Sequence, residues 1–433
     1  MAPIRRFRLI AAAVCVMTCA CPWGAATARA DEPAEPAGDA RIAPSDLHYV
    51  GAFRLPDGPD EFAWGWSGQA LAYRADGDPD GADDGHPGSL FGTGHDWHHR
   101  VSEITIPRPV VSEDKNLDDL PTAETLQPFA DIGGPLFDEM EQARAGLAWL
   151  PPQGEQTSAK LYFCRGPHMH EAQAVPSHGW CEPDLSEPDP AGPWRIADEW
   201  TYVTTDYLLP IPPRWAAEHT PPMRLATGRF RDGGQGSQGP TLLAIGPWNH
   251  GNPPAAGATL DAVTLLRYSS VVDYEQHTLE NYHHSDDWAG AAWLTSGDRA
   301  AVVFVGTKGK GECWYGFANG VVWPEEGPWP EVPDPPNDQR GWWSSAFAAE
   351  MLFYDPADLA AVAAGDMEPW APQPYATLEF ADRLFREREQ LEMRHVGAVA
   401  YSPAARTLYV IELRADGDKS LIHAWRVGAD APE

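Results

Sequence analysis

Short apolar runs recur along the chain in groups of four, and polar turns separate each run from the next. The first run of each group joins small apolar residues to an aromatic residue, at 70–73, 146–149, 290–293 and 398–401, with a degenerate copy at 224–230. Runs this short, bounded by turn residues, are typical of β-strands. The pattern therefore predicts an all-β fold made of repeated units.

The later runs of each unit follow the same order. The second runs lie at 89–94, 160–164, 241–245, 301–307 and 407–413, the third runs at 101–106, 206–211, 262–268, 350–354 and 421–427, and the fourth runs at 125–132, 278–282 and 375–380. No fourth run is visible in the second unit. The last unit lacks one because the sequence given ends there.

A spare run at 47–55 precedes the first unit and supplies the strand that the last unit lacks. A ring of blades closed in this way leaves only short sheet edges exposed. We therefore predict a five-bladed β-propeller of four-stranded antiparallel blades, closed by the N-terminal strand. The units are longer than ordinary blades, so six blades stay an alternative, as does a β-sandwich.

The first thirty residues have the three-part pattern of a secretory signal. A basic start (1–8) precedes an apolar stretch (9–20), and a small-x-small sequence ends at Ala30. We expect cleavage there, a flexible tether at 31–44, one propeller domain at 45–433, and a secreted or periplasmic protein. A lipid anchor on Cys19 or Cys21 is the alternative.

Three cysteines follow the signal, and an oxidising compartment favours a disulfide between two of them. Cys164 and Cys181 are the nearest pair, so we predict that they are bonded, with Cys313 left over. The other pairings and three unpaired thiols stay open.

The composition narrows the set of partners. The formal net charge of −32 repels phosphate backbones and anionic lipid headgroups, so we expect neither nucleic-acid binding nor a membrane-surface role. No run after the signal approaches the roughly 20 apolar residues of a membrane span. We expect a monomer that is not embedded in a membrane.

In a propeller, the loops between second and third strands share one face with the loops that link successive blades. On this chain those loops gather imidazole, carboxylate, cationic and indole groups, which is the usual make-up of a ligand cleft. The predicted ligand-binding residues are His95, Asp96, Trp97, Arg165, His168, Trp248, His250, Trp288, Lys308 and Trp314. A Trp- and Pro-rich insertion at 317–343 is expected either to cover this cleft or to pack on the blades.

Two kinds of chemistry fit such a face. Glycoside cleavage needs two carboxylates at working distance, and the candidates are Glu61, Glu139, Asp287 and Glu392. Exposed indole rings would stack on sugars, so the leading hypothesis is a protein that binds, and can hydrolyse, an extracellular carbohydrate or another polar polymer. The alternatives are a non-catalytic binding or scaffolding propeller and a metal-dependent hydrolase of small molecules. Nucleotide-binding loops are not found in the sequence, so we expect no nucleotide cofactor.

The turn between the first two strands of the first unit resembles the start of a calcium-binding loop. Alternate carboxylates in such a loop converge on one hard cation. The expected ligands are Asp76, Asp78, Asp80 and Asp84. The usual glutamate at the twelfth position is replaced by Pro87, so we predict either a structural calcium site or an acidic turn without an ion.

Four segments resemble a group of exported bacterial proteins of unknown function. They lie at 49–56, 94–97, 101–107 and 353–359 and span most of the chain that follows the signal. The resemblance supports the predicted fold and implies no activity.

Overall fold

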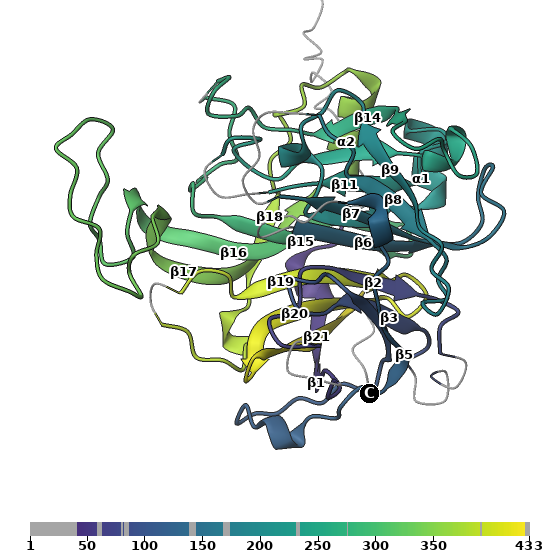
Figure 1. The fold of residues 1–433 in the computed structure, drawn as a ribbon, viewed down its shortest axis with the longest axis horizontal. Coiled ribbons are helices and arrows are strands. Elements are labelled where there is room, and N and C mark those ends of the chain that lie inside the picture. The colour runs from purple at the N-terminus through teal and green to yellow at the C-terminus, as the bar shows by residue number, and fades with distance from the viewer. Residues whose placement is uncertain are drawn as a thin grey trace, which may run out of the picture. The chain divides into compact units, whose positions relative to one another are not determined.

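The computed structural model describes residues 41–58, 63–78, 81, 86–137, 144–167, 174–230, 234–274, 276–389 and 392–428. Its strands form five sheets, and the innermost strands of these sheets contact one another in a closed ring (Figure 1). This confirms the predicted five-bladed β-propeller with four-stranded blades.

Within each of the first four blades, the four main strands follow one another in chain order from the centre of the ring outward. Blade one holds β2 (Leu71–Arg74), β3 (Ser89–Thr93), β4 (Val101–Thr105) and β5 (Thr125–Ala130). Blade two holds β6 (Arg144–Leu150), β7 (Lys160–Gly166), β8 (His178–Cys181) and β9 (Ala191–Ile196), and β13 (Thr259–Leu260) adds a short parallel edge. Blade three holds β10 (Tyr207–Pro210), β11 (Leu225–Gly228), β12 (Leu242–Ile245) and β14 (Ala262–Leu266).

Blade four has the longest strands, and blade five closes the ring. Blade four holds β15 (Asp287–Ser296), β16 (Arg299–Gly316), β17 (Gly341–Tyr354) and β18 (Ala376–Glu379). Blade five holds β19 (Val396–Ser402), β20 (Thr407–Asp416) and β21 (Lys419–Val427), with β1 (Leu47–Arg54) as its outermost strand. The antiparallel pairing of β1 with β21 is the closure that the sequence predicted.

Blades two and three differ from the sequence prediction by one strand. The segment 206–211, predicted as the third strand of blade two, is β10, the inner strand of blade three. The outer strands of blade two are β8 and β9, whose sequences HGWC and AGPWRI contain residues that are poor strand formers. The segments predicted as the first, second and third strands of blade three are therefore its second, third and fourth strands. The segment 278–282, predicted as the fourth strand, is a loop.

The core consists of apolar clusters that lie between neighbouring blades, because alternate residues of a strand face opposite sides of its sheet. Ala291 and Trp293 of β15 pack towards blade three, whereas Ala292 and Leu294 pack towards blade five. Both faces of a blade are thus covered, which explains why the inner strands appear as continuous apolar runs.

Two short helices lie outside the blades. The helix α1 (Pro213–His219) follows β10, and α2 (Pro356–Ala364) follows β17 and packs on β14. Asp355 caps α2 by accepting a hydrogen bond from the backbone N–H of Ala357, and Gly365 ends it in the left-handed conformation. Within the described part of the chain, neither helix has the length and apolar character needed to cross a bilayer.

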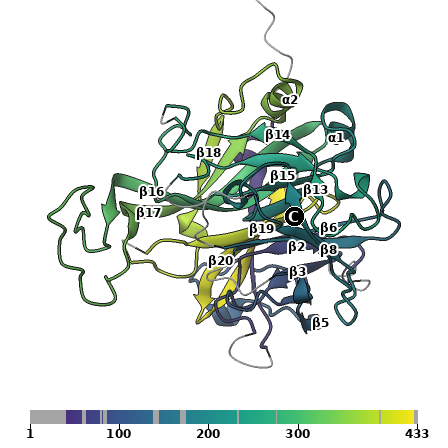
Figure 2. The same cartoon turned by 45° about the horizontal axis from the view of Figure 1, so that its top comes forward.

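The strands β16 and β17 extend well beyond their blade. Past the pair Thr307 and Ala349, each of them pairs with no other described strand than its partner, and the ribbon ends at the pair Gly316 and Gly341. Figures 1 and 2 both show this hairpin reaching outward from the blades. We call residues 314–343 the arm, and we call the side of the propeller that carries it the arm face.

Candidate functional site

The arm face carries the loops between second and third strands and the links between blades. The one-strand displacement in blade three moves part of the predicted site away from it. The turn containing Trp248 and His250 connects β12 to β14 and lies on the opposite face, where Trp248 packs against Gly154. The prediction that these two residues line a common cleft with Trp97 is therefore wrong.

Two of the predicted sugar-stacking indoles are buried. Trp288 is the second residue of β15 and packs between blades three and four. Trp248 is enclosed between blades two and three, and its Nε1 donates to the carbonyl of Pro222 at 3.1 Å. Neither ring is accessible to a sugar, which corrects their predicted role. Trp97, in contrast, is 74% exposed, and Trp314 is half-buried on the arm.

The loop of blade one holds its predicted residues close together. The ring of His95 lies beside the carboxylate of Asp96, and its Nδ1 accepts a hydrogen bond from the backbone N–H of Trp97 at 3.1 Å. Arg165, at the end of β7, donates to the carbonyl of His99 at 2.9 Å and joins blades one and two. The predicted ligand His168 lies outside the described residues.

Lys308 has a structural rather than a ligand-binding position. Its ammonium group donates to both carboxylate oxygens of Asp286, at 2.8 and 3.0 Å, and both side chains are buried. Burial raises the pKa of Asp286 to about 6, and the Lys308 charge opposes that rise. The pair holds the link into β15 against β16, because Asp286 also accepts the N–H of Gly309.

Two of the four candidate catalytic carboxylates are described, and both lie on the arm face. Asp287 Oδ2 is 3.4 Å from Arg144 Nη2 and 3.0 Å from Arg394 Nε, at the points where three inner strands begin. Glu392 is held by arginines as well. Glu61 and Glu139 lie outside the described residues, so the structure defines no catalytic pair.

The metal and disulfide predictions have different outcomes. Asp80 and Asp84 lie outside the described residues, and Asp76 is paired with Arg74 at 2.9 Å, so the calcium site stays a prediction. No group of three or more His, Cys, Asp or Glu side chains is arranged to hold a metal within the described residues. This result neither supports nor contradicts the alternative of a metal-dependent hydrolase.

The predicted Cys164–Cys181 disulfide is not formed, and both side chains are buried free thiols. In the pairing of β7 with β8, Cys181 stands opposite Leu161, three residues from Cys164. An odd spacing places the two side chains on opposite faces of the sheet. Cys164 faces blade three and Cys181 faces blade one, so the sheet itself separates the sulfurs.

A polar cavity of about 700 Å³, which no sequence motif predicted, lies between the connections of blades three and four. Its lining is rich in amide and hydroxyl groups and includes Gln238, Gln276, Thr278, Glu280, Asn281, Tyr282, His284 and Gln373. Such groups donate and accept hydrogen bonds without carrying charge. Sequence patterns do not reveal the cavity, because segments almost 140 residues apart form its wall.

Aromatic rings continue from this cavity to the arm. Tyr282 and His284 have ring centroids 5.1 Å apart, and His284 stacks on Trp342 at 4.1 Å. Trp342 stands directly across the ribbon from Tyr315, with centroids 5.3 Å apart. Residues opposite each other on antiparallel strands share a face, so these rings form one continuous surface.

The row extends towards the end of the arm. The guanidinium of Arg340 lies over Tyr315 at 5.7 Å and over Trp323 at 4.4 Å. Trp323 is nearly parallel to Trp329, at 6.3 Å and 10°, and Trp329 is 62% exposed. We call this row the aromatic track, and its members are Tyr282, His284, Trp342, Tyr315, Trp323 and Trp329. The only feature of the sequence that indicated this track is the density of tryptophan in 317–343.

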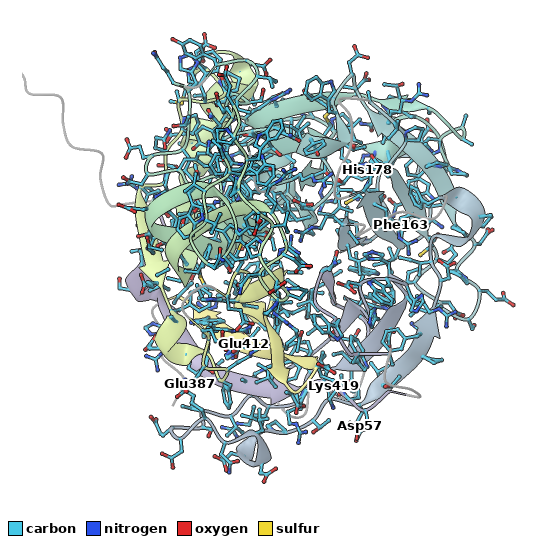
Figure 3. The ribbon with its side chains drawn as sticks, turned by 60° about the vertical axis from the view of Figure 1, so that its left-hand side comes forward. Asp57, Phe163, His178, Glu387, Glu412 and Lys419 are labelled. Atoms are coloured by element: carbon cyan, nitrogen blue, oxygen red, sulfur yellow. The ribbon has the colours of Figure 1, made fainter. Side chains whose placement is uncertain are left out.

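The sequence analysis also missed buried polar groups that join blades two and three. His178, at the start of β8, is enclosed by side chains in Figure 3, and its Nε2 lies 2.8 Å from Thr227 Oγ1. Burial lowers its pKa to about 3, so the ring is neutral. Nearby, the buried Arg229 lies 3.2 Å from Asp206. These groups align blades and do not line the site.

Comparison with known proteins does not assign a family. No protein-family model and no curated protein matches the sequence. Among solved structures, a humanized mutant of the Chaetomium thermophilum Polycomb Repressive Complex 2 bound to the inhibitor GSK126 matches at 10% identity and a TM-score of 0.31, over 89% of this chain and 99% of that one. A glucose dehydrogenase matches at 11% identity and a TM-score of 0.31, over 87% of this chain and 100% of that one. Likenesses this weak carry no argument about function.

Proposed function

We propose that the protein binds a carbohydrate chain along the aromatic track, with one part of the chain in the adjoining polar cavity. The observation that carries this proposal is the continuity of the track, from Tyr282 at the cavity to the exposed Trp329 on the arm. A pyranose has apolar C–H faces and a hydroxyl rim. Aromatic rings suit the faces, because their electron-rich surfaces attract C–H groups.

The lining of the cavity suits the hydroxyl rim. Gln238 and Asn281 each carry both a donor and an acceptor, which is the pairing that a hydroxyl needs. Gln373 instead holds the wall together, because its amide accepts from the N–H of Glu280 and donates to the carbonyl of Thr278. Glu280 is the only acidic residue of the described lining, so the cavity is polar without strong charge. An extended row of rings favours a polymer over a single sugar, because successive sugar units can contact successive parts of the row.

The proposal concerns binding and does not extend to hydrolysis. Glycoside cleavage needs an acid and a base or nucleophile at opposite sides of one bond. Asp287 and Glu392 are each engaged by guanidinium groups, and neither belongs to the described cavity lining. The export signal expected at 1–30 would bring the protein to extracellular polysaccharides, and we propose that it acts there.

Calorimetric titration with neutral oligosaccharides of several linkages tests this proposal. We expect Trp342→Ala and Tyr315→Ala each to weaken binding by about tenfold, since aromatic anchors carry much of the free energy of an interface. Trp97→Ala is the matched control, because this exposed indole lies in blade one and outside the track. Equal losses in all three variants would contradict the track as the binding surface.

A scaffolding role is the second candidate, because apolar side chains are exposed on the arm. Val322 and Val332 are both more than half exposed, on the same arm as the exposed Trp329. A protein partner would use these residues, whereas a sugar would use the rings. Val322→Ser with Val332→Ser should therefore leave oligosaccharide binding unchanged; a loss of sugar binding in this variant would favour the apolar surface over the track.

A further inference from the structure

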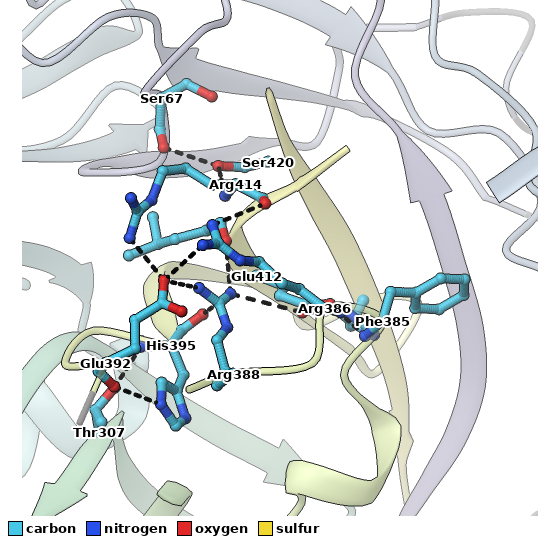
Figure 4. Close-up of polar contacts among 12 residues, drawn as sticks. Ser67, Thr307, Phe385, Arg386, Arg388, Glu392, His395, Glu412, Arg414 and Ser420 are labelled. Carbon is cyan, nitrogen blue, oxygen red and sulfur yellow. Dashed lines mark hydrogen bonds and ion pairs between the residues drawn. The ribbon is translucent and has the colours of Figure 1, made fainter. Parts of the chain in front are cut away.

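A group of arginines gathers on the arm face of blade five. Arg386, Arg388 and Arg414 place guanidinium nitrogens 2.9, 3.1 and 3.0 Å from a single atom, Glu392 Oε1 (Figure 4). Arg388 is only 6% exposed and also donates to the carbonyls of His395 and Leu413. It therefore forms the buried floor of the group, and Arg386 and Arg414 form its more open side.

Positive charge exceeds negative charge at this place. A second ion pair adjoins the group, in which Arg394 and Arg144 share the carboxylate of Asp287. Among the described residues, the contacts of these two networks join five guanidinium groups to three carboxylates, the third being Glu412, and Asp418 adds a fourth carboxylate whose charge acts on Arg414. This excess lies in a chain whose net charge is −32.

The excess charge cannot be removed by deprotonation, because a guanidinium stays protonated in proteins. The pKa of Arg414 is lowered by burial, then by the charge of Arg386 and, more weakly, by that of Arg394, which shows that the three cations lie near one another. The charge of Asp418 acts in the opposite direction. Holding several cations together favours binding of an anion.

The backbone of this region is strained as well. Trp66, Arg394 and Arg414 have φ values of 56°, 59° and 52°, a left-handed conformation that bulky residues rarely adopt. The guanidinium of Arg414 lies 4.8 Å above the ring of Trp66, which is 47% exposed. Strained residues gather at ligand sites, where the surrounding structure holds them for a purpose other than stability.

We propose that this group binds the carboxylate of an acidic sugar, so that the chain recognised by the protein contains uronate residues. Arg394 and Arg414 supply the guanidinium forks, and Trp66 supplies the stacking surface for the ring. Arg394 contacts Asp287 through Nε at 3.0 Å, and its side chain is 40% exposed, so part of its guanidinium is open to solvent and accessible to an anion. This inference rests on the proposed function, since it names the class of chain that binds.

Two observations favour a carboxylate over a phosphate. Glu392 already shows that a carboxylate fits among these guanidiniums. With Asp418 counted, the described groups carry an excess of one positive charge, which matches the single charge of a uronate and not that of a phosphate dianion. The group is also tied to the strand that continues into the arm, because the N–H of His395 donates to Thr307 Oγ1 on β16.

The test compares three oligomers of equal length: an oligogalacturonate, its methyl ester and a neutral oligoglucoside. In calorimetric titrations of the full protein, we expect the acid to bind about tenfold more tightly than its ester, and this preference to decrease with added salt. Arg394→Gln and Arg414→Gln should each remove most of the preference, by weakening binding of the acid more than binding of the ester. Arg214→Gln is the control, because Arg214 is exposed on α1, away from the arm face.

The outcomes separate this inference from the proposed function. Equal affinity of the wild-type protein for acid and ester would overturn the inference while the aromatic track stands, and this comparison does not depend on how a variant folds. A preference that survives both arginine substitutions would overturn the assigned site. Failure of all three oligomers to bind would overturn the proposed function and this inference together.

Discussion

Single buried polar residues hold neighbouring blades in register. His178 links β8 of blade two to β11 of blade three through Thr227, and its other ring nitrogen lies 2.9 Å from Ser177 Oγ. A buried polar group stabilises only while its partners are present, and an unpaired one costs more than an apolar residue would. Such residues therefore specify how the blades meet.

The neutral His178 has a consequence for stability against pH. In the unfolded chain the imidazole takes up a proton near pH 6.5, whereas burial lowers its pKa to about 3 in the folded protein. Between these values the unfolded state binds more protons, so the free energy of unfolding falls as the pH is lowered through this window. One such group contributes a slope of up to about 1.4 kcal/mol per pH unit.

We expect His178→Gln to reduce this slope in denaturant titrations between pH 6.5 and 4, and to cost about 1–3 kcal/mol at pH 7 through lost hydrogen bonds. His219→Gln is the control, because this side chain on α1 keeps contact with solvent. A slope identical to that of the wild-type protein in His178→Gln would contradict the assignment.

At the scale of the elements, β16 and β17 leave their sheet as a two-stranded ribbon, and the arm consists of the end of this ribbon and the connection 317–340. Isolated ribbons of this kind are marginally stable in water. Cross-strand aromatic pairs compensate here, with Tyr315 opposite Trp342 on one face and Trp314 opposite Trp343 on the other. The same rings thus stabilise the arm and supply its binding surface.

Because the arm pairs with no other strand, its removal should spare the propeller. Replacing residues 314–343 with Asn-Gly would join Cys313 to its partner Ser344 through a two-residue turn. We expect the thermal midpoint of unfolding to stay close to that of the full protein and oligosaccharide binding to be lost. Retention of binding by this variant would show that the arm does not form the site.

At the scale of the whole molecule, the N-terminal segment ties the ring together. β1 pairs with β21, and the segment before it contacts blade four, where Asp46 accepts from Arg299 at 2.7 Å and the N–H of Ile42 donates to Ala300. Phe53 of β1 is buried between blades five and one. Loss of this segment would expose the edge of β21 together with apolar surface.

Deleting residues up to Arg54 should therefore abolish cooperative thermal unfolding or make the protein aggregate. The control begins at Asp31 and keeps the closing strand. A permuted chain, in which residues 41–58 follow Gly428 through a short Gly/Ser linker, should regain the wild-type transition, because β1 and β21 are antiparallel neighbours. Normal unfolding of the shortened chain would refute ring closure as a source of stability.

The accuracy of the sequence prediction followed the strength of the local signal. Blades one, four and five were predicted strand by strand, because both faces of their inner strands are apolar and turns separate them clearly. The prediction for blade two was wrong because β8 and β9 contain Gly, Pro and His among their few apolar residues. That single error moved Trp248 and His250 to the wrong face.

The amino-acid sequence alone determined the repeat, the closing strand and the enrichment of tryptophan near the arm, and it favoured five blades while leaving six blades and a β-sandwich open. These properties depend on the local pattern of apolar and polar residues and on turn residues, and both can be read directly from the sequence. Only the tertiary structure decided which rings lie in a row, which indoles are buried and which arginines meet at Glu392. Those contacts join residues from different blades, and their partners are set by the twist and packing of whole sheets.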